Sequence, residues 1–342
     1  MEKTKMKNIA NKILMASVAA LLAATCVHAI PRGPCDQKPK DICCQDPKPG
    51  PFAFSYAKDL GLACPRDFYF HADFVLAQAQ EEGLDYAIEN RQNSLTAVDG
   101  GYVSGFSDTS NSWDWRYGFK IGMGFFLNHD AWNVDAEWTW FYSKQNASTN
   151  LIGTGYLIPL WMPSTFVPAV ALAKDASAKW NLTYNTFDVK LGRPYHLSRY
   201  LVANPHYGIR AAWIEQRYLA RYSGGPLLPY HAGGSNDFLA RNNYWGVGAR
   251  AGFDLEYLLG SGWSLFGKFA AALLYGKFHV LQYTTLANGY DAEVDHEFYQ
   301  IEPNMDLSLG VSWGRFYSKR KYHVTAIVGY DFHHFWHQNN MR

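Results

Sequence analysis

Residues 113–127 read WDWRYGFKIGMGFFL, and every second residue from Trp113 to Leu127 is apolar or aromatic. The residues between them are mostly charged or glycine. Successive side chains of a β-strand point to opposite faces, so this segment has one continuous apolar face. Strands of soluble sheets are typically about 5–6 residues long, whereas a tilted strand that crosses a bilayer takes about 9–11 residues and carries aromatic residues near both ends. The segment therefore predicts a membrane-crossing strand of an outer-membrane β-barrel.

Eight further segments repeat this alternation, although the pattern in one of them is imperfect. They are 67–90, 132–142, 180–191, 201–213, 245–257, 263–273, 299–313 and 322–332. Short connections at 128–131, 192–198, 259–262 and 314–319 alternate with long ones, as in bacterial barrels with short periplasmic turns and long outer loops. We therefore expect an all-β, antiparallel, up-and-down transmembrane barrel of about ten strands. Nine strands are visible, and we expect the last one to be missing, because an open edge in lipid leaves backbone groups unpaired.

Two local features depart from the simple pattern. The parity of the apolar positions in 180–191 changes near Asn185, which predicts a β-bulge. The long interruption at 144–179 contains a helix-like piece at 169–178, and the interruption could fold into the barrel or cap it from outside.

Composition agrees with a membrane barrel and excludes other classes. The 342 residues carry a net charge of +1, which argues against a nucleic-acid partner, and 16% of them are aromatic. The chain has no apolar run of about 18 residues, so a helical membrane span is not expected.

The N-terminal residues predict export. Four lysines, at positions 3, 5, 7 and 12, precede the apolar run 13–24, and Val27-His28-Ala29 fits the small-x-small cleavage pattern. This predicts a signal peptide over 1–29, a Cys/Pro-rich periplasmic leader over 30–65 and the barrel over 66–342. Lipidation of Cys26 is the alternative, but its flanking residues do not match the usual pattern.

Cysteine usage supports the same compartment. Cys35, Cys43, Cys44 and Cys64 all precede the first predicted barrel strand. In an oxidising periplasm they predict disulfides, within the chain or between chains. The alternative is a zinc site with four thiolates, but the adjacent pair Cys43-Cys44 lacks the C-x₂-C spacing.

The alternation also predicts which charged side chains face the interior of the barrel. They are Asp73, Asp114, Arg116, Lys120, Asp135, Glu137, Arg210, Arg250, Asp254, Glu256, Lys268, Glu302, Asp306 and Asp331. Nine of these fourteen are acidic, and carboxylates in a pore favour cations, so a weak cation preference is expected. The alternative is that these charges pair with one another across strands and fill a narrow lumen.

The other motifs in the sequence do not indicate a metal site or a catalytic site. His333, His334 and His337 could bind a metal ion, but a position at the membrane interface explains them equally well. His296-Glu297 begins a zinc-protease pattern, yet Gln300 stands where the second histidine is required. We find no Ser/His/Asp or Cys/His set, and therefore predict no catalysis, no cofactor and no metal.

Five short motifs in the barrel region are informative together. They are Phe70-His71-Ala72-Asp73-Phe74, Ala79-Gln80-Glu81-Glu82-Gly83-Leu84, Val134-Asp135-Ala136-Glu137-Trp138-Thr139-Trp140, Leu191-Gly192-Arg193-Pro194-Tyr195 and the segment Pro205 to Ile214. With them the chain resembles, over roughly 66–340, the Legionella-type major outer-membrane protein family of pore-forming barrels, which has relatives in environmental chlamydiae. The resemblance implies a porin-like channel in the bacterial outer membrane, and a final strand ending in an aromatic residue, which is not found here. It also implies an envelope linked through cysteines.

The leading functional hypothesis is a porin that passes ions and small hydrophilic solutes by diffusion. Its expected partners are outer-membrane lipid, further copies of the chain and disulfide-linked envelope proteins. The alternative is a disulfide-linked structural envelope protein or surface adhesin with a plugged barrel. An outer-membrane hydrolase is a third hypothesis, and it would need a Ser or Asp with a His at one rim.

Overall fold

The structure is a computed structural model that describes residues 12–19, 68–90, 101–106, 113–127, 132–162, 172–224, 234–285, 291–319 and 321–341, with backbone alone for 12–19. Within these ranges no helix is long and apolar enough to cross a membrane. The four leader cysteines lie outside the described residues, so their disulfides stay a prediction.

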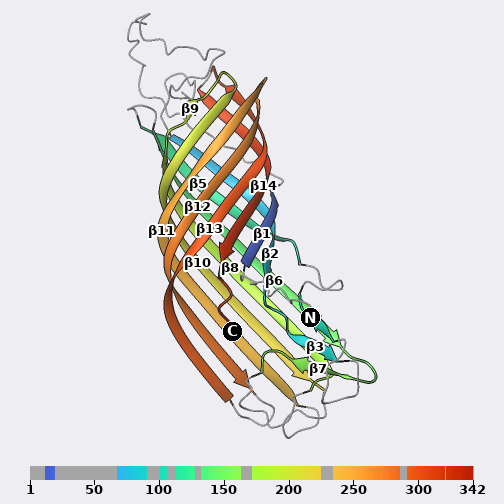
Figure 1. Ribbon diagram of the computed structural model, residues 1–342. Coiled ribbons are helices and arrows are strands. Elements are labelled where there is room, and N and C mark those ends of the chain that lie inside the picture. Colours follow the sequence, from blue (N-terminus) through green and yellow to red (C-terminus); the bar gives the residue numbers. More distant parts are fainter. Residues whose placement is uncertain are drawn as a thin grey trace, which may run out of the picture.

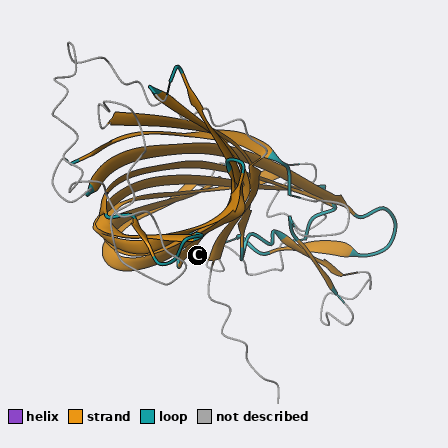
Figure 2. Ribbon diagram, turned by 90° about the horizontal axis from the view of Figure 1, so that it is seen from above, coloured by secondary structure: helices purple, strands orange, loops and turns teal. Residues whose placement is uncertain are grey.

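Ten antiparallel strands form the wall of the molecule (Figure 1). They are β1 (Lys12–Ala19), β2 (Phe68–Glu81), β5 (Arg116–Phe126), β6 (Asn133–Asn150), β8 (Asp175–Gly192), β10 (Leu201–Ser223), β11 (Ser235–Gly260), β12 (Trp263–Thr285), β13 (Asp291–Tyr317) and β14 (Tyr322–Trp336). Each strand pairs with its neighbour along the chain, and β1 pairs with both β14 and β2. Viewed from above, the strands surround one lumen (Figure 2). The predicted all-β up-and-down barrel of about ten strands is confirmed.

Four short strands complete the described elements. β3 (Ala87–Asn90), β4 (Tyr102–Ser104) and β7 (Tyr156–Pro159) form a separate three-stranded sheet, and β9 (Tyr195–His196) extends the pairing of β10.

Turn chemistry explains the tightest hairpin. Between β11 and β12, Gly260 and Gly262 have φ values of 102° and 86°, a region that glycine enters without steric cost. The register of β11 and β12 shifts once beside this turn, between Leu258 and Gly260, and is regular along the rest of the pair.

The nine strands expected from the alternation correspond to nine of the ten wall strands, and three local expectations are wrong. The segment 67–90 is not one strand, because β2 ends at Glu81 and β3 belongs to the separate sheet. The helix-like piece is contradicted over 175–178, where β8 is already a strand, while 169–171 lie outside the described residues. The bulge near Asn185 is absent, because Asn185 pairs regularly with Trp140 of β6 and Trp213 of β10.

The apparent change of parity in β8 has a different cause. Trp180, Leu182 and Tyr184 are all buried, on the same face as Asp188, whereas Phe187 is 42% exposed on the outer face. The inner face itself becomes apolar towards the long-loop end of the barrel, so the apolar residues seem to change sides although the strand stays regular.

The tenth place in the wall is taken by β1, which lies inside the predicted signal peptide. Lys12–Ala19 pairs with 329–336 of β14, and Ile13–Ser17 pairs with 77–81 of β2. β1 does not extend to the short-turn end of the barrel. There, residues 322–328 of β14 pair only with β13, and residues 68–76 of β2 pair only with β5, among the described strands. The place between β14 and β2 is therefore filled over part of its length.

An apolar band surrounds the outer wall. On β11 it runs from Trp245 to Tyr257, and on β12 from Trp263 to Tyr275, with exposed Val247, Phe253 and Leu265 among the residues between. Aromatic residues at both limits of an apolar band are typical of strands that cross an outer membrane.

Ion pairs on the outer face begin where the band ends. Lys277 lies 2.8 Å from Glu297. The hydrogen bond that Lys277 donates lowers the pKa of the Glu297 carboxyl from its ordinary value.

At the long-loop end the interior is packed. Tyr86 and Trp161, beside the three-stranded sheet, are buried against Trp180, Tyr218 and other side chains of the inner wall. The Tyr218 hydroxyl donates to the Leu84 carbonyl at 3.2 Å. The described part of the 144–179 connection therefore folds inward, which the sequence alone left open.

The segment after β14 also lies inside. Gln338 and Met341 are fully buried, and the Gln338 carbonyl accepts a hydrogen bond from the Asn242 side chain. Together with Phe335, this segment closes the packed region from the β14 side.

Candidate pore site

The strand register aligns charged side chains across the inner wall. In one row, His71 of β2 lies beside Gly122 of β5, then Glu137 of β6, Asp188 of β8 and Arg210 of β10. Because alternate residues of each strand face inward, the neighbouring rows on the same face are also rich in charged residues. The charged rows and the packed apolar region occupy different levels of one lumen.

Arg210 connects two sides of this lumen. Its Nη2 donates to Asp188 and to Asp306, each at 2.6 Å, and its Nη1 donates to Asn304 at 2.8 Å. Asp306 belongs to β13, and β11 and β12 separate β13 from β10 in the wall. The contact therefore spans the lumen instead of linking neighbouring strands.

A second bridge starts from β5. Lys120 donates to Asp331 of β14 at 2.8 Å and lies 3.1 Å from Nε2 of His333. Nδ1 of His333 lies 2.8 Å from Asp306, and Arg250 donates to Asp306 at 3.1 Å. Both bridges thus meet at Asp306 and form one ion-pair network.

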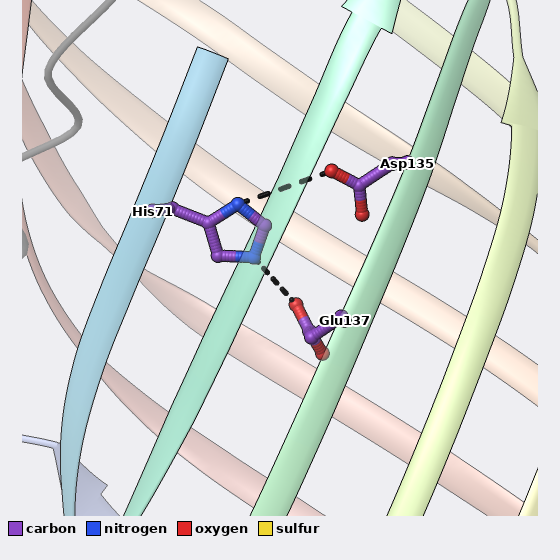
Figure 3. A group of neighbouring side chains, drawn as sticks. All are labelled: His71, Asp135 and Glu137. Atoms are coloured by element: carbon purple, nitrogen blue, oxygen red, sulfur yellow. Dashed lines mark hydrogen bonds and ion pairs between the residues drawn. The ribbon is translucent and has the colours of Figure 1, made fainter.

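A third group lies on β2 and β6, the two strands on either side of β5 (Figure 3). The two ring nitrogens of His71 face Asp135 at 3.9 Å and Glu137 at 3.1 Å. Lys190 of β8 approaches the other oxygen of Asp135 at 3.1 Å. Nearby, His206 lies 3.4 Å from Asp254.

A polar cavity of about 80 Å³ lies between these groups. Charged and histidine side chains that line it are Asp73, Lys120, Glu137, Lys190, His206, Arg250, Asp254, Lys268, Asp306, Asp331 and His333. A cavity of that size has room for a few water molecules, so the lumen is narrow at this level.

The structure gathers ten of the fourteen predicted inward charges at this site. They are Asp73, Lys120, Asp135, Glu137, Arg210, Arg250, Asp254, Lys268, Asp306 and Asp331. Asp114 and Arg116 instead pair with each other at 2.9 Å, and Asp114 is exposed. Glu256 accepts from Ser264, and Glu302 is fully buried with no hydrogen-bond partner in the described residues.

Several residues of the site were not in the predicted set. Asp188 and Lys190 alternate with the outward residues Phe187 and Val189, and that pattern was sufficient to place them inside. The histidines of the site were absent from the predicted set of inward residues, because that set contained only aspartate, glutamate, lysine and arginine. The position at the membrane interface expected for His333 is wrong, because His333 lines the lumen cavity and its Nδ1 hydrogen-bonds with Asp306.

A barrel with an apolar aromatic-edged outer band and a charged lumen defines a bacterial outer-membrane protein. Residues 64–342 match the family model described as the Legionella pneumophila major outer membrane protein precursor. The match covers most of the chain, which therefore belongs to this family of outer-membrane proteins and is located in the bacterial outer membrane. The family is not one of enzymes. A search of curated proteins gives no match.

Proposed function

We propose that the protein is a channel that passes ions and small hydrophilic solutes by diffusion, with a weak cation preference. The observation that carries this proposal is the charged lining of the lumen within the membrane-spanning part. Ionisable side chains at membrane depth are costly and are typical of solute or ion pathways. The family membership supports the same porin-like role.

The charge balance supports the direction of the preference. The site contains seven carboxylates and five lysine or arginine side chains, which leaves two negative charges when the histidines are neutral. The carboxylates are Asp73, Asp135, Glu137, Asp188, Asp254, Asp306 and Asp331, and the cations are Lys120, Lys190, Arg210, Arg250 and Lys268. Carboxylates in a pore favour cations, so the excess favours weak cation selectivity.

Passage of a solute requires the cross-lumen contacts to open. The bridges from Arg210 to Asp306 and from Lys120 to Asp331 cross the path. The channel is therefore expected to alternate between conducting and closed levels.

Single-channel recording in a planar bilayer under a KCl gradient tests the proposal. We expect conductance steps with a reversal potential on the cation side, and we expect Asp73→Asn to move that potential towards the anion side. Asp73 lines the cavity, and its removal breaks no ion pair among those described. The matched control is Asp295→Asn on the outer end of β13, where the carboxylate is 58% exposed, and it should leave the potential unchanged. An anion-side potential in the wild type, or equal shifts in both variants, would refute the proposed selectivity.

One observation favours a second candidate, a structural envelope protein with a plugged barrel. The packed region around Trp161, Tyr218 and Phe335 fills the interior at the long-loop end. Under this alternative, protein that is folded by the criterion of heat-dependent mobility in SDS gels stays electrically silent. Conductance from the same preparation excludes it.

A further inference from the structure

His71, Asp135 and Glu137 bring three different metal-ligating side chains together on the lumen wall (Figure 3). One ligand atom from each residue lies within 4.8 Å of the others. We propose that they form a binding site for one divalent transition-metal ion of the zinc class. The inference rests on the proposed function only in that an aqueous lumen gives the ion access.

The backbone between these residues leaves room for the arrangement. Gly122 of β5 lies in register between His71 and Glu137. A Cβ atom at Gly122 would lie 2.3 Å from both Cε1 and Nε2 of His71, so the imidazole occupies the space that a side chain would fill. The glycine therefore allows the ring to extend across β5 to the carboxylates of β6.

Neighbouring groups hold the imidazole and one carboxylate in place. The ring of Tyr69 stacks on His71 with an interplanar angle of 21°. Lys190 engages Oδ1 of Asp135, which leaves Oδ2 directed at His71. Side chains that support ligands in this way increase metal affinity.

Two carboxylates face His71 here, and the ion pair between Lys190 and Asp135 offsets part of their negative charge. Glu137 has no lysine or arginine within ion-pair distance among the described residues, and its partner there is His71 at 3.1 Å. Lys120, the nearby cation of β5, is paired with Asp331. A divalent ion would offset the two excess negative charges of the whole site when the histidines are neutral.

The ligand types identify the class of ion. Calcium and magnesium prefer oxygen ligands, whereas an imidazole with carboxylates suits zinc and its neighbours in the transition series. The side chains of His71 and Glu137 are 14% and 20% exposed, so an ion can reach them from the lumen. Because the two carboxylates face different ring nitrogens, the side chains must rotate so that one nitrogen and both carboxylates reach the metal–ligand distances of about 2.0–2.2 Å typical of zinc. Water from the cavity can complete the coordination.

Metal binding to the folded full chain in detergent tests the proposal without any measurement of current. We expect Zn²⁺ titrated calorimetrically to bind with one site per chain, and Co²⁺ to show visible absorption that Zn²⁺ abolishes. His71→Ala and the isosteric Glu137→Gln should each weaken binding at least about tenfold. Gly122→Ala should weaken it similarly although it removes no ligand, because the new methyl group displaces the imidazole.

The control is His279→Ala, which removes a histidine that bonds to Asp295 outside the membrane band and belongs to no three-ligand cluster among the described residues. It should leave the affinity unchanged. Absence of binding in the folded wild type, or equal losses in His279→Ala and His71→Ala, would overturn the site. Electrical silence combined with stoichiometric Zn²⁺ binding would count against the channel and leave the metal site standing.

Discussion

Arg210→Met is expected to lower the free energy of unfolding by about 3–5 kcal/mol, the typical cost of removing one partner of a buried ion pair. The guanidinium is 3% exposed and bonds to two carboxylates that are themselves 4% and 8% exposed. Without it, Asp188 and Asp306 remain close together in a confined space with one fewer compensating charge. Urea titration of the detergent-folded protein, followed by tryptophan fluorescence, measures the loss.

Arg221 on the same strand provides the matched control. It also makes a two-point contact with an aspartate, Asp237, at 2.8 and 2.7 Å, but its side chain is 56% exposed. Exposed ion pairs contribute about 0–1 kcal/mol, so Arg221→Met should have little effect. Combining Arg210→Met with Asp188→Asn should recover part of the lost stability, because Asp306 keeps Arg250 and His333 as partners. If Arg210→Met and Arg221→Met lowered the free energy of unfolding equally, burial would not determine how much the Arg210 ion pairs contribute to stability.

The strands could be predicted because membrane and lumen impose opposite demands on alternate residues. Trp245 to Tyr257 meets both demands over its whole length, and its alternation is visible in the sequence. Trp263 to Tyr275 meets the outer demand, although several of its inner residues, such as Phe266 and Leu274, are apolar. The same rule placed Lys120, Arg210 and Asp306 inside. Where both faces of a strand are apolar, the alternation cannot identify the inner face. This is why the sequence predicted a bulge in β8 that the structure does not contain.

The partners of the inward charges could not be predicted in the same way. Alternation identifies the face of a residue, but Arg210 meets Asp306 across the lumen, and the two are not on neighbouring strands. Such a contact depends on how the sheet curves and on the offset between all the intervening strands. His71 reaches Glu137 for a more local reason, because a glycine stands between them. Knowledge of which residues of β2, β5 and β6 pair with one another would have been sufficient to predict that His71 approaches Glu137.

The second large effect is expected when β1, the strand between β14 and β2, is removed. A chain that starts at Ile30, as the predicted cleavage requires, lacks β1. We expect it to lose the folded species that migrates differently in SDS gels before and after heating. The edges of β14 and β2 would then be open along their length, and each unsatisfied backbone group in lipid costs several kcal/mol.

A chain that starts at Lys12 is the matched control, because it is also truncated but keeps the eight residues of β1. It should fold in detergent as the full chain does. Equal heat-dependent mobility of the two truncated chains would show that the wall closes without β1. The expected difference would mean that β14 and β2 require a strand between them. A protein processed at Ala29 would then have to fill that place with another strand, because the hydrogen-bonding groups at those edges are present whichever segment pairs with them.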